Sequence, residues 1–305
     1  MKALKLLLKT ILCLFALVGV LTVALILYAK SGYLDINIEE TTLGRLDERV
    51  ELLRTAGTYA ADSVEFNMQS IADSAKAAEI RAYFQLDTLC SAEATTWEKT
   101  LAIAKFVSDN IPHANQKAQP TRRDAITLWE YTKTTEPAFN CRLHSILLYE
   151  LLSSVGITAS YITCMPKIEE SDCHVVNQVW LPELRKWAMI DSDQANYATD
   201  EAGTPLSLSE IRERYISGED IWYHPHYGKA TKKKTWYYAY MAKNLYWFSC
   251  WETLHFGQEC WDENQETGRY VNLVPSGYQP YGIEVSEDGT AIVTSDARQF
   301  WAVPQ

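Results

Sequence analysis

The sequence predicts a protein of the α+β class, in which one helix packs on an antiparallel sheet. The helix is indicated by apolar residues that recur at helical spacing over residues 143–155, followed by Gly156 as a natural helix end. The sheet is indicated by three stretches rich in β-branched and aromatic residues, at 157–164, 174–180 and 187–191. The chain of 305 residues is long enough to bury a self-supporting core.

The first 29 residues are predicted to form a transmembrane signal anchor. Residues 11–28 contain no charged side chain, and such a run is long enough to cross a hydrocarbon layer of about 30 Å. Lys2, Lys5 and Lys9 precede it, which favours a cytoplasmic N-terminus and an extracytoplasmic remainder. A cleaved signal peptide is the alternative, but the end of the apolar run lacks a clear small-x-small cleavage pattern.

The segment after the anchor, residues 30–94, is predicted to form a polar and mainly helical neck. Leu46, Val50 and Leu53 fall on one stripe of a helix. The segment contains no motif that carries chemistry. We therefore expect it to act as a stalk or as a brace for the core that follows.

Two helices are predicted to precede the nucleophile. Residues 95–98, Thr-Thr-Trp-Glu, form a capping box, so a helix should begin there and end near Pro112. A second, short helix is expected over residues 124–132. The connecting residues 113–120 contain amides that could contribute to an oxyanion hole. A plain polar connector is the preferred interpretation, and the backbone N–H of Cys141 is the preferred oxyanion donor.

Cys141 is the candidate nucleophile because it lies in the first turn of the predicted helix over residues 143–155. At that position, unsatisfied backbone N–H groups and the positive end of the helix dipole stabilise a thiolate relative to a thiol. A thiolate needs a base that removes its proton. The base in turn needs a carboxylate that fixes its tautomer.

His174 and Asp191 are the candidate base and orienting acid. His174 opens one predicted strand and Asp191 ends the next, so antiparallel pairing would bring the two within a residue or two of each other. Asp193 is the alternative acid, because strand alternation sets it on the same face as Asp191 and only the hairpin register chooses between them. Asp191 is the preferred assignment. Cys173 points to the opposite face from His174, so it is a poor rival nucleophile.

The order Cys, His, Asp in these contexts resembles the transglutaminase-like superfamily. The resemblance covers roughly residues 95–218 and implies a papain-like catalytic core. It implies that Cys141 is the nucleophile, that His174 is the general base and acid, and that Asp191 orients the imidazole. The matching segments are Asn140-Cys141-Arg142 and residues 151–157, 172–180 and 186–191.

Residues 219–305 are predicted to form an aromatic-rich C-terminal β extension. Aromatic side chains concentrate between Trp222 and Trp261. Packing of this layer against the core is the preferred role, and lining of a substrate cleft is the alternative. Residues 282–285 and 290–294 alternate around a turn and predict a terminal hairpin.

No metal or cofactor is predicted, since His224 and His226 lack further ligands at a typical zinc spacing. The chain has 28 basic and 39 acidic residues and a formal net charge of −11. Three of its lysines precede the apolar run, so the remainder is more acidic still. This charge argues against nucleic acid as a partner.

Seven cysteines in a chain with an expected extracytoplasmic part raise the question of disulfides. The sequence alone establishes no pairing. The open alternatives are Cys164 with Cys173 and Cys250 with Cys260.

The predicted function is that of a single-pass, membrane-anchored cysteine enzyme that forms a thioester on an amide substrate outside the cytoplasm. Hydrolysis of a peptide, protein or cell-wall amide is preferred over transglutaminase-type crosslinking, because nothing in the sequence marks an amine-acceptor site. The alternative is a non-catalytic, surface-displayed binding module that retains the fold.

Overall fold

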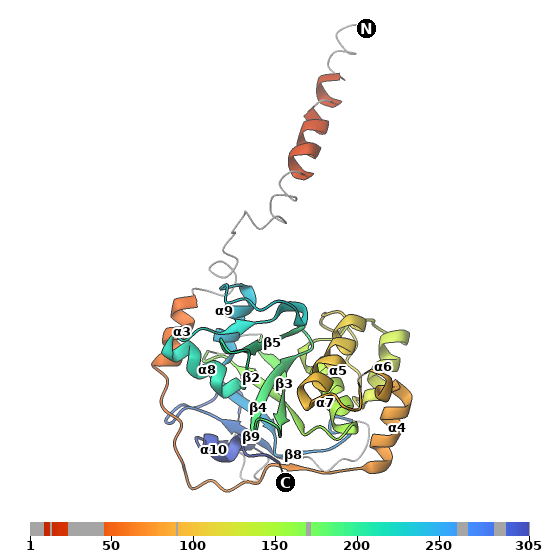
Figure 1. Ribbon diagram of the computed structural model, residues 1–305. Coiled ribbons are helices and arrows are strands. Elements are labelled where there is room, and N and C mark those ends of the chain that lie inside the picture. The colour runs from red at the N-terminus through yellow and green to blue at the C-terminus, as the bar shows by residue number, and fades with distance from the viewer. Residues whose placement is uncertain are drawn as a thin grey trace.

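The computed structural model describes a central β-sheet with helices on both of its faces (Figure 1). This mixture of helices and a mainly antiparallel sheet confirms the predicted α+β class. The described residues are 9–12, 14–23, 46–89, 91–168, 172–260, 268–283 and 291–304.

Eight strands form the central sheet in the order β10-β9-β7-β2-β3-β4-β5-β6. Neighbouring strands run antiparallel, except that β9 and β10 are parallel. A separate parallel pair is formed by β1 (Gln69–Ser70) and β8 (Thr253–Leu254). The central strands are β2 (Ala159–Met165), β3 (His174–Leu181), β4 (Lys186–Asp191), β5 (Asn196–Thr199), β6 (Trp222–Tyr223), β7 (Trp247–Trp251), β9 (Tyr270–Leu273) and β10 (Ala291–Thr294).

One face of the sheet is covered by helices that precede β2 in the chain. Among them α7 is buried almost completely beyond its first turn, and it packs on β2 and β3. Its apolar side chains share one core cluster with Val175, Val179 and Ile190 of the sheet. The helices of this layer are α4 (Ser74–Phe84), α5 (Thr96–Asn110), α6 (Ala125–Thr134) and α7 (Cys141–Ser154), with the short 3-10 helix η1 (Leu86–Thr88) after α4.

The opposite face carries a second core cluster, to which the sheet contributes Val176, Met189 and Phe248. The earliest described helix of the predicted neck, α3, packs here against α8 and α9, whereas α4 packs against α7. The described part of the neck therefore contributes to both helical layers. The helices of this second layer are α3 (Leu46–Arg54), α8 (Leu208–Ser217), α9 (Trp236–Asn244) and α10 (Ala297–Phe300), and the 3-10 helix η2 (Pro225–Tyr227) follows β6.

The helix boundaries around the nucleophile agree with those predicted from capping residues. Helix α5 begins with the capping box of Thr95 and Glu98, in which each side chain bonds the other residue's backbone N–H. Helix α6 has Asp124 as its N-cap. After α7, Gly156 adopts a φ of 80°, the left-handed conformation that glycine reaches without steric cost.

The C-terminal region continues the central sheet and does not form a separate β extension. Strand β7 pairs with β2, with Phe248 opposite Cys164, and β9 and β10 follow on its far side. The region also contributes helix α9, because residues 235–244 begin with a Thr235 cap and run without a helix breaker. The connecting residues of the predicted terminal hairpin, 284–290, lie outside the described residues; the described partner of β10 is β9.

Part of the predicted membrane anchor is described. Residues 9–12 and 14–23 are helical, and their side chains are exposed. Within the described residues, no helix has the length and apolar character that crossing a membrane requires. Residues 24–28, which complete the predicted apolar run, lie outside the described residues.

A buried carboxyl group of α7 joins this helix to α6 and to the C-terminal region. Glu150 is 1% exposed and accepts hydrogen bonds from the backbone N–H of Ala125, at the start of α6, and from that of Gly257, each at 2.6 Å. Burial disfavours the ionised carboxylate, and the two N–H donors favour it. Because the effect of burial is larger, the pKa of Glu150 is raised to about 7. Glu150 therefore takes up a proton in the folded protein at a pH where the unfolded chain is ionised.

We predict that Glu150 makes the folded state less stable as the pH rises from about 4.5 to 7. A raised carboxyl pKa contributes stability below the pKa of the unfolded chain and loses it as the pH passes the folded-state pKa. The unfolding free energy of the wild-type protein should fall by about 3 kcal/mol over this range relative to that of Glu150→Gln. Urea unfolding of both proteins at each pH measures this change. The exposed control Glu79→Gln should show no such slope, and a flat difference for Glu150→Gln would contradict the prediction.

Candidate active site

Cys141 is the first residue of α7, and its position is fixed by the residues just before it. Asn140 is the N-cap, and its side-chain oxygen accepts the Leu143 N–H at 3.0 Å. Cys141 itself is partly buried and has a free thiol. The backbone N–H of Cys141 has no hydrogen-bond partner among the described residues, as expected in a first helical turn. An N–H that is free at this position is available to an oxygen of a bound substrate.

Gln116 supports the segment that carries the nucleophile. Its side-chain nitrogen donates to the carbonyl groups of Ala114 and Ala138, both at 2.8 Å, and its oxygen accepts the Asn140 N–H at 3.3 Å. Gln116 lies in the connector over residues 113–120. Because both of its N–H donors are already used, its amide positions the Cys141 segment and is not free to act as an oxyanion donor.

Hydrogen bonds also fix α7 against the strand that carries His174. The Ser145 hydroxyl donates to the carbonyl group of Val175 at 2.9 Å, and the Asn177 side chain donates to the carbonyl group of Ser145 at 2.9 Å. All of these groups are buried. Buried hydrogen bonds are costly to break, so they hold the first turn of α7 at a set position relative to the start of β3.

His174 and Asp191 lie in direct contact, although they are not opposite each other in the sheet. The register sets Asn177 opposite Ile190, so Asp191 falls two residues from His174 across the ladder. The imidazole Nε2–H donates to Asp191 Oδ2 at 2.6 Å, and both side chains are at most 1% exposed. Strand pairing and side-chain contact together bring this acid to this base.

The charge of His174 is stabilised by these neighbours. Burial opposes the imidazolium form, but the charge and the hydrogen bond of Asp191 outweigh it and raise the pKa of His174 well above its usual value. Interaction with Cys141 adds to the same effect. The remaining ring nitrogen, Nδ1, is buried and has no partner at hydrogen-bond geometry. Nδ1 is therefore the ring nitrogen of His174 that Asp191 leaves open.

Asp191 accepts four hydrogen bonds through its two carboxylate oxygens. Oδ1 accepts the backbone N–H groups of Asp193 and Gln194, at 3.0 and 2.9 Å. Oδ2 accepts His174 and also the hydroxyl group of Tyr237, at 2.7 Å. Because both of its oxygens accept two hydrogen bonds, this carboxylate cannot rotate away from the imidazole without breaking several hydrogen bonds at once.

Helix α9 supplies aromatic side chains to the His174 side of the site. Tyr237 bonds Asp191, and the ring of Tyr240, one helical turn later, lies edge-on to His174 at a centroid distance of 5.0 Å. Tyr240 also donates to the carbonyl group of Cys173 at 3.0 Å, and Trp236 stacks on it at 4.7 Å. The concentration of aromatics is visible in the sequence, but no sequence pattern assigns Tyr237 or Tyr240 to the site.

Asp193, the alternative acid, has a different partner. It lies in the turn after β4, where its Oδ1 accepts a hydrogen bond from His113 Nδ1 at 2.6 Å. Its side chain is 1% exposed and lies 3.7 Å from Nε2 of the buried His144. The structure therefore brings His174 together with Asp191, and it sets Asp193 beside His113 in a second pair.

A buried ion-pair network lies immediately next to the nucleophile. Arg142 donates to both oxygens of Glu259, at 2.9 and 2.5 Å, and Arg123 adds a third bond at 2.9 Å. Burial opposes the charge of Glu259, but the charge of Arg142 lowers the pKa of this carboxyl group below its usual value. Because the two arginines exceed the one glutamate, the cluster adds positive charge close to the start of α7. No sequence pattern pointed to Glu259, which lies more than a hundred residues from Arg142.

The other described cysteines differ from Cys141 in their surroundings. Cys164, Cys250 and Cys260 are buried, and burial raises the pKa of each thiol. Cys173 is partly exposed, but burial of its sulfur raises its pKa as well. All five described cysteines are free thiols, so neither Cys164 with Cys173 nor Cys250 with Cys260 is paired.

These contacts define a class of site: a cysteine at a helix start beside a buried histidine–aspartate pair, as acyl-transfer enzymes with thiol nucleophiles have. Comparison with known families agrees. Residues 85–192 match the model of the Transglutaminase-like superfamily. This segment, which is similar to that superfamily, contains Cys141, His174 and Asp191. The resemblance predicted from the sequence motifs is thereby confirmed.

Two solved structures resemble the chain at low identity, and no curated protein matches it. One is a candidate cysteine protease from Cytophaga hutchinsonii, with 17% identity over 47% of this chain and 41% of that one, at a TM-score of 0.29. The other is a candidate protease from Parabacteroides distasonis, with 13% identity over 64% of this chain and 30% of that one, also at a TM-score of 0.29. The chain thus spans less than half the length of either structure.

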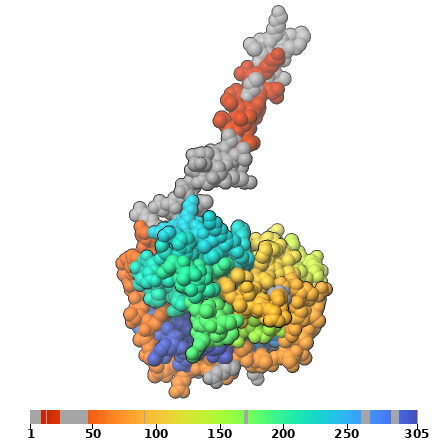
Figure 2. Space-filling model, in the orientation of Figure 1, coloured from red at the N-terminus to blue at the C-terminus, as the bar shows by residue number. Residues whose placement is uncertain are grey.

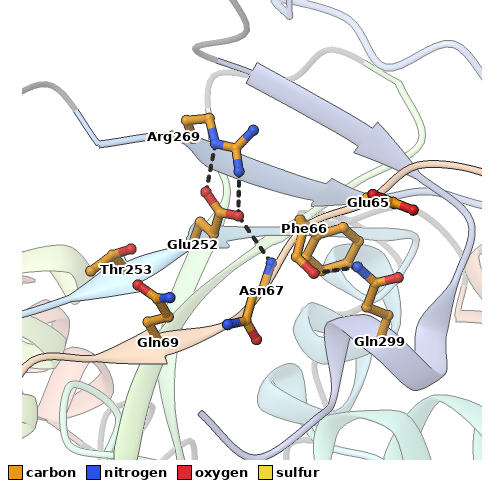
Figure 3. Close-up of a pocket in the computed structure, with 8 residues that line it drawn as sticks. All are labelled: Glu65, Phe66, Asn67, Gln69, Glu252, Thr253, Arg269 and Gln299. Carbon is orange, nitrogen blue, oxygen red and sulfur yellow. Dashed lines mark hydrogen bonds and ion pairs between the residues drawn. The ribbon is translucent and has the colours of Figure 1, made fainter. Parts of the chain in front are cut away.

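A separate pocket of about 620 Å³ is lined by residues of β1, β8 and α10 and by Arg269, just before β9. Figure 3 shows its polar lining, in which Arg269 forms two hydrogen bonds with Glu252. Glu252 also accepts the backbone N–H of Asn67 at 3.0 Å. Arg269 and Glu252 therefore satisfy each other's charge, and the residues that line this pocket do not include Cys141, His174 or Asp191.

We predict that Tyr237→Phe lowers the reactivity of Cys141 while leaving the fold intact. The variant removes one hydroxyl group that holds Asp191, and hydrogen bonds to charged groups are worth about 1.5–3 kcal/mol. Because only part of this energy orients His174, the alkylation rate of Cys141 at neutral pH should fall about threefold to tenfold. Tyr238→Phe is the matched control on the same helix, since no hydrogen bond from its hydroxyl occurs among the described residues. Equal rates for the two variants would argue against a role for Tyr237.

Proposed function

We propose that the protein is a cysteine enzyme that cleaves amide bonds through a thioester on Cys141. The observation that supports this most directly is the state of His174. Its Nε2 is bound by the buried Asp191, its Nδ1 has no partner at hydrogen-bond geometry, and the imidazole interacts with Cys141. The match to the Transglutaminase-like superfamily supports the same class of chemistry.

In the proposed mechanism, His174 Nδ1 accepts the proton of the Cys141 thiol, and Asp191 stabilises the imidazolium that forms. The thiolate attacks the carbonyl carbon of the amide. The developing oxyanion accepts a hydrogen bond from the Cys141 backbone N–H, which has no partner among the described residues. When the carbon–nitrogen bond breaks, His174 gives its proton to the leaving amine and a thioester remains.

The second half of the proposed reaction resolves the thioester. His174, again neutral, takes a proton from water as the water oxygen attacks the thioester carbonyl carbon. The carbon–sulfur bond then breaks, the acid product leaves, and Cys141 is restored. An amine in place of water would give crosslinking. Hydrolysis remains the preferred outcome, since no feature of the described residues marks an amine-acceptor site. The substrate class is a peptide, protein or cell-wall amide.

The competing proposal is a non-catalytic binding module that retains the fold. A binding module has no use for a buried histidine–aspartate pair beside a cysteine, because burying charged groups costs free energy that packing alone would avoid. The four hydrogen bonds to Asp191 therefore favour the enzyme.

We predict that iodoacetamide at neutral pH labels Cys141 faster than the other four described cysteines. Labelling followed by peptide mass analysis measures each site separately. His174→Ala should slow labelling of Cys141 without changing that of Cys260, because the groups that act on the Cys260 thiol do not include the imidazole. A Cys141 rate equal to that in the denatured protein would favour the binding module.

We also propose that residues 11–28 anchor the protein in a membrane, with the catalytic core outside the cytoplasm. The described part of this segment is helical, and its apolar side chains are exposed, including Leu12 and Phe15, each at 72%. Exposed apolar residues around a whole helix favour a lipid environment over water.

The anchor predicts that the full-length protein sediments with membranes and that alkaline carbonate does not release it. Replacing Leu14 and Leu17 with lysine should move the protein to the soluble fraction, because charged groups within an apolar layer are strongly disfavoured. Protease added to intact cells should degrade the core of the wild-type protein. Recovery of a soluble wild-type protein that begins near Ser31 would instead establish a cleaved signal peptide.

A further inference from the structure

His113 and Asp193 form a second histidine–aspartate pair beside the first. Asp193 is buried, with its side chain 1% exposed, whereas the imidazole of His113 is 48% exposed. His113 Nδ1 donates to Asp193 Oδ1 at 2.6 Å. The other ring nitrogen, Nε2, has no partner among the described residues, so this exposed nitrogen is available to a ligand.

The backbone sets His113 next to the nucleophile segment. Residue 113 forms a parallel bridge with Phe139, two residues before Cys141. The Phe139 carbonyl accepts the N–H of Ala114 at 2.8 Å, and the Phe139 N–H donates to Pro112 at 3.0 Å. His113 also lies close enough to His174 for their charges to interact. It therefore sits at the rim of the site that contains Cys141 and His174.

The charges around His113 favour its protonated form. Its hydrogen bond with Asp193 raises its pKa above the usual value, and burial and the charge of His174 act against this. Asp193 also faces His144, but burial lowers the pKa of that imidazole. Burial therefore disfavours a positive charge on His144, and His113 is the histidine whose protonated form Asp193 favours.

We propose that His113 is a substrate-binding residue, which binds a carboxylate group of the substrate next to the amide attacked by Cys141. The substrate would then be an acidic peptide, with a carboxylate close to the bond that is cleaved. The inference rests on the proposed function and deepens it. An imidazolium that is fixed through Nδ1 presents its Nε2–H in one direction, as a group that binds carboxylates should.

The test compares alkylation of Cys141 in the full-length protein by iodoacetate, which is anionic, and iodoacetamide, which is neutral. At pH 6 the ratio of the two rates should fall about threefold to tenfold in His113→Gln, because a cation near the thiolate no longer attracts the anion. The iodoacetamide rate should change less than twofold. Asp193→Asn should lower the ratio mainly near neutral pH, since His113 would then lose its proton at a lower pH. His226→Gln, at another exposed histidine, is the control and should leave the ratio unchanged.

A second measurement addresses the peptide. N-acetylglutamate α-amide should protect Cys141 from iodoacetamide better than N-acetylglutamine α-amide, which has no carboxylate, and His113→Gln should abolish the difference. An unchanged ratio in His113→Gln, or equal protection by the two compounds in the wild-type protein, would overturn the inference. Equal slowing of both reagents would assign His113 a purely structural role. Slow reaction of wild-type Cys141 with both reagents would instead contradict the proposed function.

Discussion

The described site depends on the hydrogen bonds that the carboxylate of Asp191 accepts. This carboxylate joins four pieces of the chain: β4, which carries it, His174 at the start of β3, the turn at residues 193–194, and Tyr237 of α9. Its backbone carbonyl accepts a further bond from Tyr227 of η2, at 2.9 Å. A buried charge with this many donors is stable only when all of them are in place, so the geometry of the site and the packing around it are coupled.

The site lies where the two helical layers meet at one end of the sheet. Cys141 packs with the cluster on the α7 face, whereas Tyr237 belongs to the cluster on the α9 face. His174 lies between them at the first position of β3. Figures 1 and 2 show these two helical layers: residues from about 74 to 154 lie on one side of the molecule, and residues from about 200 to 245 lie on the other. The three candidate residues thus come from elements that are held together by the sheet, and not from one continuous motif.

Local patterns were enough to predict the elements that hold the three candidate residues. Capping residues and helical periodicity indicated α5, α6 and α7, and strand alternation indicated β3 and β4, because these features depend on neighbouring residues alone. Strand alternation could not decide between Asp191 and Asp193, because residues two apart on a strand point to the same face. The choice is decided by the turn at residues 192–195, in which Ala195 has a φ of 47°, and by His113, eighty positions earlier. Gln116, Tyr237 and Glu259 also act through contacts between distant segments, which a single sequence does not reveal.

The order of strands in the sheet has a consequence for how the protein is made. Strand β2 lies between β3 and β7, yet β7 begins only at Trp247, long after the family-matching segment has ended at residue 192. A ribosome-bound chain that has just completed β4 therefore presents β2 with an unpaired edge and Asp191 without Tyr237. Pairings between such distant segments form slowly, and an open edge can pair with another chain in the meantime. Nascent chains thus complete the site late in synthesis. Expression of residues 85–192 alone would leave the sheet without β7, and the exposed edge of β2 would favour aggregation.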